Sequence, residues 1–416
     1  MTRRWLVVAV AGACLIAAVG ALRMSSRFAT VVGVYREDGS LGVRARVREY
    51  LELPNVSWNA ASPGEVGLSS KALESLQVSL AAQGTSSLLV ARRGQLALEW
   101  YAGDYGPNRR EPLAAAAKGI TASVVLLAAL SDGLVGLDDR VASYVPEWQQ
   151  DPWRSQVTLR HLASHSSGIE EVNFNAEHSG WKDVYFQNED LRYGLALRAP
   201  ILFEPGTRFS YAGVGYYVLT CVLGVALDRA LDPTDVRAYL RSRVMSAVGI
   251  PSSAWSLNYG QIHEVDDMRL YAIGSGAEYT PRAVARIGQL LIQDGEWEGD
   301  RVLDATWVRQ ALTYAGSPPV REGVATDPPA GLGWWVNVDR FLPSLPEDAA
   351  VAFGTGEQVL LVVPSLQLVA VRLGAPLSRA GERPWRVAER ELFEPLMAAL
   401  DDSGTTSERT LRGRPD

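Results

Sequence analysis

Residues Glu111–Trp148, EPLAAAAKGITASVVLLAALSDGLVGLDDRVASYVPEW, form the stretch around which the rest of the chain is organised. Four consecutive alanines, a lysine at Lys118 and a long apolar run predict a helix that ends at Gly133, because glycine readily adopts the left-handed conformation that closes a helix. A lysine one turn into an apolar helix is chemically unusual, since burial disfavours the ammonium form and can turn lysine into a base. One turn before Lys118 stands Ala115, which has no proton to give.

Composition places the chain among ordinary folded proteins. Its 416 residues are enough for two or three structural layers with an ample core. The hydrophobic content of 47% and charged content of 21% are typical of a soluble domain. A net charge of -7, without a basic stripe interleaved with aromatic residues, argues against a nucleic-acid partner. The two cysteines are Cys14 and Cys221, and the first lies in the N-terminal apolar segment, so no disulfide framework is expected.

The N-terminal residues 1–26 predict a signal peptide or a membrane anchor. Trp5–Leu22 is an uncharged apolar run of about 18 residues, near the lower limit for spanning a bilayer. Arg3 and Arg4 precede it and are expected to stay in the cytoplasm, while Ala18-Val19-Gly20 offers a small-residue cleavage site. Both a cleaved and an uncleaved segment fit. We therefore expect the folded part to lie outside the cytoplasm, either anchored in the cell membrane or exported to the periplasm.

The remaining sequence predicts an α+β fold. Residues 27–61 are expected to form a linker and extended lead-in, residues 62–400 one domain with a helical insertion at about 150–270, and residues 401–416 a disordered tail. The expected helices are Leu68–Ala82, Gly215–Leu227, Pro281–Asp294 and Trp385–Leu400. The expected strands are Ser87–Val90, Leu96–Tyr101, Gly333–Asn337, Gln358–Val363 and Leu368–Leu373. Strands at both ends of the domain, with helices between them, predict one antiparallel sheet built from the two termini.

Several segments, in this order and spacing, resemble the serine β-lactamase-like family, which includes class C β-lactamases, penicillin-binding proteins and related esterases. The segments are PGEVGLSSKALESL, RRGQLALEWYAG, AAAAKG, TLRHLASHSSGI, FEPGTRFSYAG, GLGWWVN and GEQVLLVVPSLQLVAVRLG. The resemblance covers about residues 62–400. It implies a β-lactamase/transpeptidase-like fold, hydrolysis of esters, amides or β-lactams, a small-molecule, peptide or ester ligand, and no cofactor.

The resemblance also implies three catalytic motifs, and the chain departs from each of them. The first is Ser-x-x-Lys, in which the serine is the nucleophile and the lysine assists its deprotonation; here Ala115 stands in the serine's place before Lys118. The second is Tyr-x-Asn, which becomes Tyr211-Ala212-Gly213. The third usually has a Lys or His two residues before a Gly, and it falls on Ala352-Phe353-Gly354.

Binding groups are implied around these motifs. The family's oxyanion hole uses two backbone N–H groups, which by the resemblance come from Ala115 and Thr355, next to Gly354, and do not depend on a side chain. Trp334 and Trp335 follow each other on a predicted strand, so one is expected in the core and the other, assigned here to Trp334, on the pocket wall. By themselves AAAAKG would also suit a solvated lysine and Tyr211 a core tyrosine, but the family pattern favours the pocket.

Loss of the serine is the decisive departure. Removing the nucleophile from such a catalytic unit costs on the order of a millionfold in rate, or roughly 8 kcal/mol of transition-state stabilisation. Ser123 and Ser131 follow on the same helix, but neither is three residues before Lys118, the spacing that puts both side chains on one face.

Other chemistry finds little support in the sequence. His161 and His165 are four residues apart and could face one metal ion, yet no third ligand accompanies them, so we expect no metal site. Pairs such as Gly354-x-Gly356 lack the third glycine and the strand-then-helix context of a dinucleotide fingerprint.

Three hypotheses follow from the sequence. In the first, the chain hydrolyses esters or amides with a water molecule activated by Lys118 and Tyr211. In the second, it is a non-catalytic relative, a pseudoenzyme that keeps the pocket and binds ligands there. In the third, Ala115 is a substitution specific to this sequence in an otherwise competent enzyme. We favour a β-lactamase-related serine hydrolase homologue of doubtful catalytic competence.

Overall fold

The computed structural model describes residues 56–171, 192–231, 234–260, 262–265, 268–316 and 327–400. The predicted membrane segment at 1–26, most of the predicted linker at 27–61 and the predicted tail at 401–416 lie outside the described residues. The end of the lead-in packs on the domain, since Val56 is buried and Ala61 donates a backbone hydrogen bond to Leu96 at 3.1 Å.

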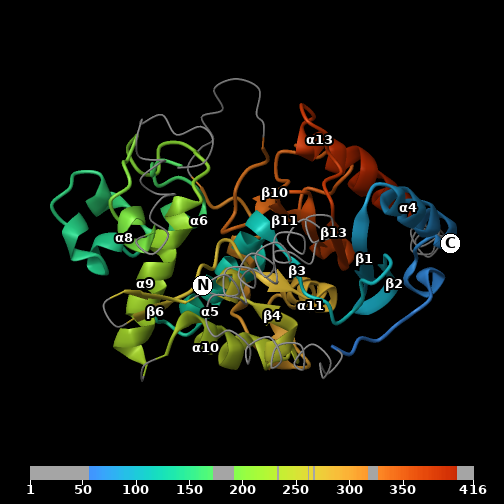
Figure 1. Ribbon diagram of the computed structural model, residues 1–416, viewed down its shortest axis with the longest axis horizontal. Helices are drawn as coiled ribbons and strands as arrows, with labels where there is room; N and C mark the ends of the chain where they lie inside the picture. The colour runs from blue at the N-terminus through green and yellow to red at the C-terminus, as the bar shows by residue number, and fades with distance from the viewer. Residues whose placement is uncertain are drawn as a thin grey trace, which may run out of the picture.

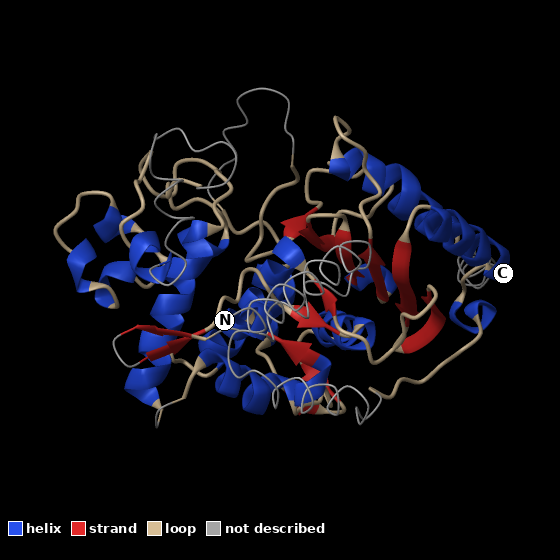
Figure 2. Ribbon diagram, in the orientation of Figure 1, coloured by secondary structure: helices blue, strands red, loops and turns tan. Residues whose placement is uncertain are grey.

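The fold is built on one six-stranded antiparallel sheet (Figure 2). Its strand order is β10-β11-β12-β13-β1-β2. The strands are β1 (Thr85–Arg92), β2 (Gln95–Tyr101), β10 (Trp335–Val336), β11 (Ala350–Gly354), β12 (Gln358–Val363) and β13 (Leu368–Gly374). The N-terminal β1 pairs with the C-terminal β13 in a register that places Leu89 opposite Val371. The predicted α+β fold with a sheet made from both termini is therefore confirmed.

Helices cover both faces of this sheet, because successive side chains of its strands point to opposite sides. On β1, Leu88 belongs to one apolar cluster and Leu89 to another. One face is covered by α4 (Ser70–Ala82) and by the C-terminal helices α13 (Pro384–Ala388) and α14 (Glu394–Ala398), of which α14 packs against α4 (Figure 1). The other face carries α11 (Pro281–Ile292) and the central helix.

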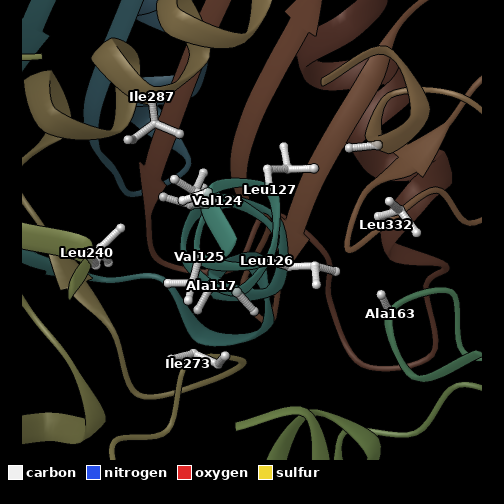
Figure 3. Packing of buried hydrophobic residues seen from close by; sticks show 14 of the residues in the cluster. Ala117, Val124, Val125, Leu126, Leu127, Ala163, Leu240, Ile273, Ile287 and Leu332 are labelled. Carbon is white, nitrogen blue, oxygen red and sulfur yellow. The ribbon is translucent and has the colours of Figure 1, made fainter. Parts of the chain in front are cut away.

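The central helix has three successive geometries rather than the single α-helix that the sequence predicts. A 3₁₀ turn covers Ala114–Ala116, a π-helical turn Lys118–Ser123, and α5 runs over Val124–Ser131. Its residues Val124 to Leu127 point to different sides and contact different parts of the fold (Figure 3), as expected for a helix that is apolar all round. Gly133 has a φ of 69°, which confirms the predicted left-handed end.

This helix also has the composition of a membrane span. Within the described residues, Ala114–Ser131 is the one helix long and apolar enough to cross a membrane, and 83% of it is buried inside the fold. It therefore forms the core of the domain here.

The segment between the two parts of the sheet is mainly helical. Its helices are α6 (Leu159–Ala163), α8 (Arg192–Ala196), α9 (Val214–Ala230) and α10 (Val236–Leu240). It also contains β4 (Trp255–Ser256), which pairs with β7 (Glu278–Tyr279), the central strand of a small sheet whose other edge is β3 (Glu111–Pro112). The hairpin of β5 (His263–Val265) and β6 (Met268–Leu270) lies in the same segment. The hairpin of β8 (Glu296–Trp297) and β9 (Asp300–Arg301) and the helix α12 (Ala305–Ala311) follow α11. The predicted strand Gly333–Asn337 was too long, because Gly333 has a φ of 83° and extended pairing begins only at Trp335.

Candidate functional site

The start of the central helix lies directly against the end of β11. A Cβ atom added at Gly354 would stand 2.3 Å from the carbonyl oxygen of Leu113 and 3.2 Å from the nitrogen of Ala115. Only glycine allows such an approach. Thr355 follows at once, so the two N–H groups that the family resemblance assigns to the oxyanion hole belong to segments in contact. Ala114 has a φ of 48°, a left-handed conformation that non-glycine residues adopt rarely and that is enriched at functional sites.

A small pocket opens beside this junction. It has a cavity volume of about 10 Å³, which is room for about one water molecule. Its lining includes the predicted residues Ala115, Lys118, Tyr211 and Trp334. The remaining lining residues are His165, Ala330, Gly333, Trp335 and Phe353. Four predicted residues from three distant segments thus meet at one place, whereas the predicted residues Gly354 and Thr355 are not part of this lining.

Lys118 is buried, with only 6% of its surface exposed. Its Nζ donates a hydrogen bond to the carbonyl oxygen of Gly274 at 3.1 Å. It also lies 5.1 Å from the ring centroid of Tyr211 and 5.2 Å from that of Tyr216, which are distances for cation–π attraction. The lysine is therefore held in the pocket by one carbonyl group and two aromatic rings, as the pocket interpretation of this residue requires.

His165 is a pocket residue that the sequence did not identify as one. Its ring stacks on Tyr211, with 4.5 Å between the centroids, and its Nδ1 accepts a hydrogen bond from the Ala212 N–H at 3.1 Å. Burial, with the nearby charge of Lys118, lowers the pKa of His165 to about 3. Because Nδ1 is an acceptor, the neutral ring carries its hydrogen on Nε2. His165 therefore offers the pocket an uncharged donor.

The two tryptophans have different surroundings, and only Trp335 lies on strand β10. Trp334 is 1% exposed and packs in the core, where its ring lies 3.1 Å from the position of a Cβ added at Gly119. Trp335 is half-buried and stacks on Tyr211 at 6.2 Å and on His165 at 6.2 Å. Although atoms of both line the pocket, the aromatic wall is formed by Trp335 rather than Trp334.

Neighbouring atoms occupy the space around Gly213 and Ala352, the two other positions at which the chain departs from the family pattern. At Gly213, the Glu171 carboxylate accepts a hydrogen bond from the backbone N–H and lies 3.1 Å from the position of an added Cβ. Ala352 is 1% exposed, and a Cβ added at Gly119 would lie 2.8 Å from its methyl group. A longer side chain at either position would meet neighbouring atoms.

The described lining of the pocket contains no serine, threonine or cysteine, and Tyr211 supplies its only hydroxyl group. Ser123 Oγ is buried away from the pocket lining, and Ser131 Oγ is bonded to the carbonyl oxygen of Leu127 at 2.7 Å. His161 Nδ1 accepts a hydrogen bond from the Thr158 N–H at the start of α6. His165 Nδ1 accepts one from the Ala212 N–H instead, so the two Nδ1 atoms are engaged by different backbone groups. In the part of the chain that the structure describes, no group of three His, Cys, Asp or Glu side chains could hold a metal ion.

The Beta-lactamase family profile matches residues 72–384, more than half of the chain, and the chain therefore belongs to the beta-lactamase family. Solved structures share the fold. A penicillin-binding protein homologue from Caulobacter crescentus is 15% identical with a TM-score of 0.60, over 80% of this chain and 99% of that one. A family VIII carboxylesterase is 18% identical with a TM-score of 0.57, over 78% and 99%. The predicted family and β-lactamase/transpeptidase-like fold are confirmed.

Among curated proteins, a candidate D-alanyl-D-alanine carboxypeptidase of Escherichia coli (strain K12) is 20% identical over 246 residues. That alignment covers 50% of this chain and 54% of the relative, so the chain spans about half the length of this protein. The acyltransferase calJ of Penicillium decumbens is 30% identical over 161 residues, which is 33% of this chain and 36% of that protein.

Proposed function

We propose that this chain is a β-lactamase-family hydrolase homologue that binds acyl compounds in the pocket beside Lys118 without forming an acyl-enzyme. One observation carries the proposal. The pocket keeps Lys118 and Tyr211, yet its described lining contains no serine, threonine or cysteine that could act as the nucleophile. Relatives described as a carboxypeptidase, a carboxylesterase and an acyltransferase support carbonyl compounds as the ligand class.

The ligand's carbonyl group would enter the small cavity between Ala115 and Tyr211. The methyl group of Ala115 presents no electron pair to it, whereas the backbone N–H groups of Ala115 and Thr355 would still bind its oxygen. The His165 ring and Trp335 form an aromatic wall for the rest of the ligand. Binding then stops before any covalent bond forms.

The decisive experiment compares the natural chain with Ala115→Ser, using a fluorescent penicillin and a fluorophosphonate. The half-exposed methyl of Ala115 lines the cavity, so a hydroxyl fits there without overpacking. We expect reversible penicillin binding by fluorescence polarisation and no label after denaturation for the natural chain. Ala115→Ser should carry covalent label at position 115, and adding Lys118→Met should abolish it. Covalent label at a defined residue of the natural chain would refute the proposal, as would an unlabelled Ala115→Ser variant.

A second candidate function is direct hydrolysis by a bound water molecule. It is favoured by the cavity volume of about 10 Å³ beside Lys118, which suits one water. Turnover of an activated ester by the natural chain, reduced to background in Lys118→Met, would establish it in place of the binding-only function.

We also propose that the domain works outside the cytoplasm, with its N-terminal segment either retained as a membrane anchor or cleaved. The apolar run Trp5–Leu22 after Arg3 and Arg4 supports this. Fractionation of cells that express the chain with a C-terminal tag, followed by protease treatment of intact spheroplasts, tests it. A tag that stays protected in the cytoplasm would overturn the proposal.

A further inference from the structure

A second, larger cavity lies beside the second half of α11. Four segments line it: residues 57–59 of the lead-in, the turn between β1 and β2, the second half of α11, and the β8–β9 hairpin. Its volume is about 250 Å³, close to the lower end of pockets that hold small organic ligands. It shares no lining residue with the pocket around Lys118. It is therefore a separate site.

Two indole rings in this lining are fixed by contacts within the protein. Trp58 donates from Nε1 to the carbonyl oxygen of Gly94 at 3.2 Å. The guanidinium carbon of Arg286 lies over Trp297, 5.3 Å from the centroid of the indole ring. Both rings are half-buried, and a ligand would not have to order them on binding. Rigid aromatic rings with an accessible part suit a ligand that has a flat apolar face.

The floor of the cavity contains a nearly buried amide, whose nitrogen lies near Gly94 of the same lining. Gln289 is 5% exposed, and its Oε1 is buried without a hydrogen-bond partner among the described residues. Such a group costs about 1–3 kcal/mol when it stays unsatisfied. Two more amides, of Asn59 and Gln293, lie in the exposed part of the lining. Amide groups both donate and accept, which is the complement of a hydroxyl group.

The charges of the lining exclude a strongly charged ligand. Arg286 is the one cation, and its Nη1 donates to the carbonyl oxygens of Val248 at 2.6 Å and Gly249 at 2.9 Å. Glu298 is the one anion and is exposed, so the formal charges of the described lining cancel. A hydrocarbon ligand fits poorly as well, because it would leave the amides without partners.

We propose that this cavity is a binding site for a neutral pyranose sugar. The C–H face of the sugar ring would lie on Trp297 or Trp58, and a hydroxyl oxygen of the sugar would accept a hydrogen bond from Gln289 Nε2, which lies 3.8 Å from the position of a Cβ added at Gly94 in the same lining. This combination of apolar face and several hydroxyls is what the two indoles and three amides jointly recognise. The site is independent of acyl chemistry at Ala115.

The test titrates the full chain with methyl β-glucoside by calorimetry and saturation-transfer NMR. The protein is kept in an amine-oxide detergent, which has no sugar headgroup. We expect saturable binding with a dissociation constant of about 1 mM, which corresponds to roughly −4 kcal/mol. Sorbitol has hydroxyls but no rigid apolar face, and glucuronate adds a charge. Sorbitol should bind at least about fivefold more weakly, since one aromatic contact contributes about 1 kcal/mol. Glucuronate should also bind more weakly, because Arg286 is already bonded to backbone carbonyl oxygens and Glu298 would repel the carboxylate.

Two variants locate the site. Trp297→Ala and Gln289→Leu should each weaken methyl glucoside binding at least about fivefold. Gln289→Leu should not lower Tm, because it removes a buried oxygen without a partner, and this separates loss of binding from loss of folding. Trp153→Ala, at a tryptophan that is 41% exposed elsewhere, and Ala115→Ser should leave binding unchanged. No saturation up to about 100 mM, equal binding of sorbitol, or binding insensitive to both site variants would overturn the proposal.

Discussion

Acid should destabilise this domain specifically through His165, because the ring is buried and neutral next to the ammonium group of Lys118. Its pKa is lowered to about 3 in the folded state, against about 6.5 in the unfolded chain. The unfolded state therefore binds the extra proton first as the pH falls. The contribution of His165 is complete above pH 6.5 and is lost progressively as the pH drops toward 3. Between pH 8 and pH 5 the linkage amounts to about 2 kcal/mol of unfolding free energy.

The groups that face this ring are Lys118 on the central helix and the phenols of Tyr211 and Tyr216, none of which is a carboxylate that could stabilise the imidazolium. A suitable comparison is His165→Asn, because asparagine tolerates the φ of 56° at this position and its Oδ1 can still accept from the Ala212 N–H.

Urea unfolding followed by fluorescence at pH 8, 7, 6 and 5 measures the effect. The natural chain should lose about 2 kcal/mol more than His165→Asn over this range, while all other titrating groups cancel in the difference. Imidazole NMR signals give a direct check, since the chain has four histidines and one of them should show no titration above pH 4. Equal pH slopes for the two proteins, or a His165 signal that titrates near pH 6.5, would refute the reasoning.

Two further predictions test the geometry of the pocket. Gly354→Ala should lower the unfolding free energy by about 1–3 kcal/mol in urea titration, because its Cβ would stand 2.3 Å from the Leu113 carbonyl oxygen. The control is Gly64→Ala, where an added Cβ meets nothing within 4 Å, and it should change the unfolding free energy by under about 0.5 kcal/mol. A small loss for Gly354→Ala would mean that the strand end and the helix start are not in contact. Lys118→Met should leave Tm unchanged or raise it, since it removes a buried ammonium that donates to the Gly274 carbonyl oxygen and has no carboxylate partner among the described residues. A clear fall in Tm would assign Lys118 a structural role.

The sheet could be predicted from the sequence because its signals are local. Val359–Val363 is a continuous apolar run, and every residue of β12 is buried, as expected for a strand covered on both faces. The turn that follows ends at Gln367 with a φ of 47°, directly before β13. Strands β12 and β13 therefore carried their own boundaries, and strands at both ends of the domain predicted one sheet. In contrast, β11 was not among the expected strands, and the strand at Trp335 was predicted too long.

The pocket could be predicted only in part. Lys118, Tyr211 and Ala115 were found through their places in two family motifs, and the structure brings them together. His165 could not be found in this way, since its role depends on packing against Tyr211 and on a hydrogen bond to Ala212, 47 residues later. No periodicity in a sequence reports such a contact.

The geometry of the central helix was missed for a similar reason. The π-helical turn Lys118–Ser123 carries Gly119, where a Cβ would stand 2.8 Å from the Ala352 methyl group and 3.1 Å from the carbonyl oxygen of Gly333. Close packing of two distant segments accompanies this turn, and helix propensity does not contain that information. The prediction that Trp334 rather than Trp335 forms the pocket wall was wrong for a similar reason. It assumed a strand that begins at Gly333, whereas β10 begins at Trp335.

The pairing of β1 with β13 also has a consequence for biosynthesis. Arg372 of β13, which is bonded to Thr85 of β1 at 3.0 Å, comes 287 residues later in the chain. At ribosomal speeds of about 5–20 residues per second, the edge of β1 waits roughly 15 to 60 seconds for its partner. During that time a row of unpaired N–H and C=O groups on an apolar strand is open to other nascent chains. Production of this protein should therefore depend on chaperones that shield an incomplete sheet, and slower translation of its second half should increase the aggregated fraction.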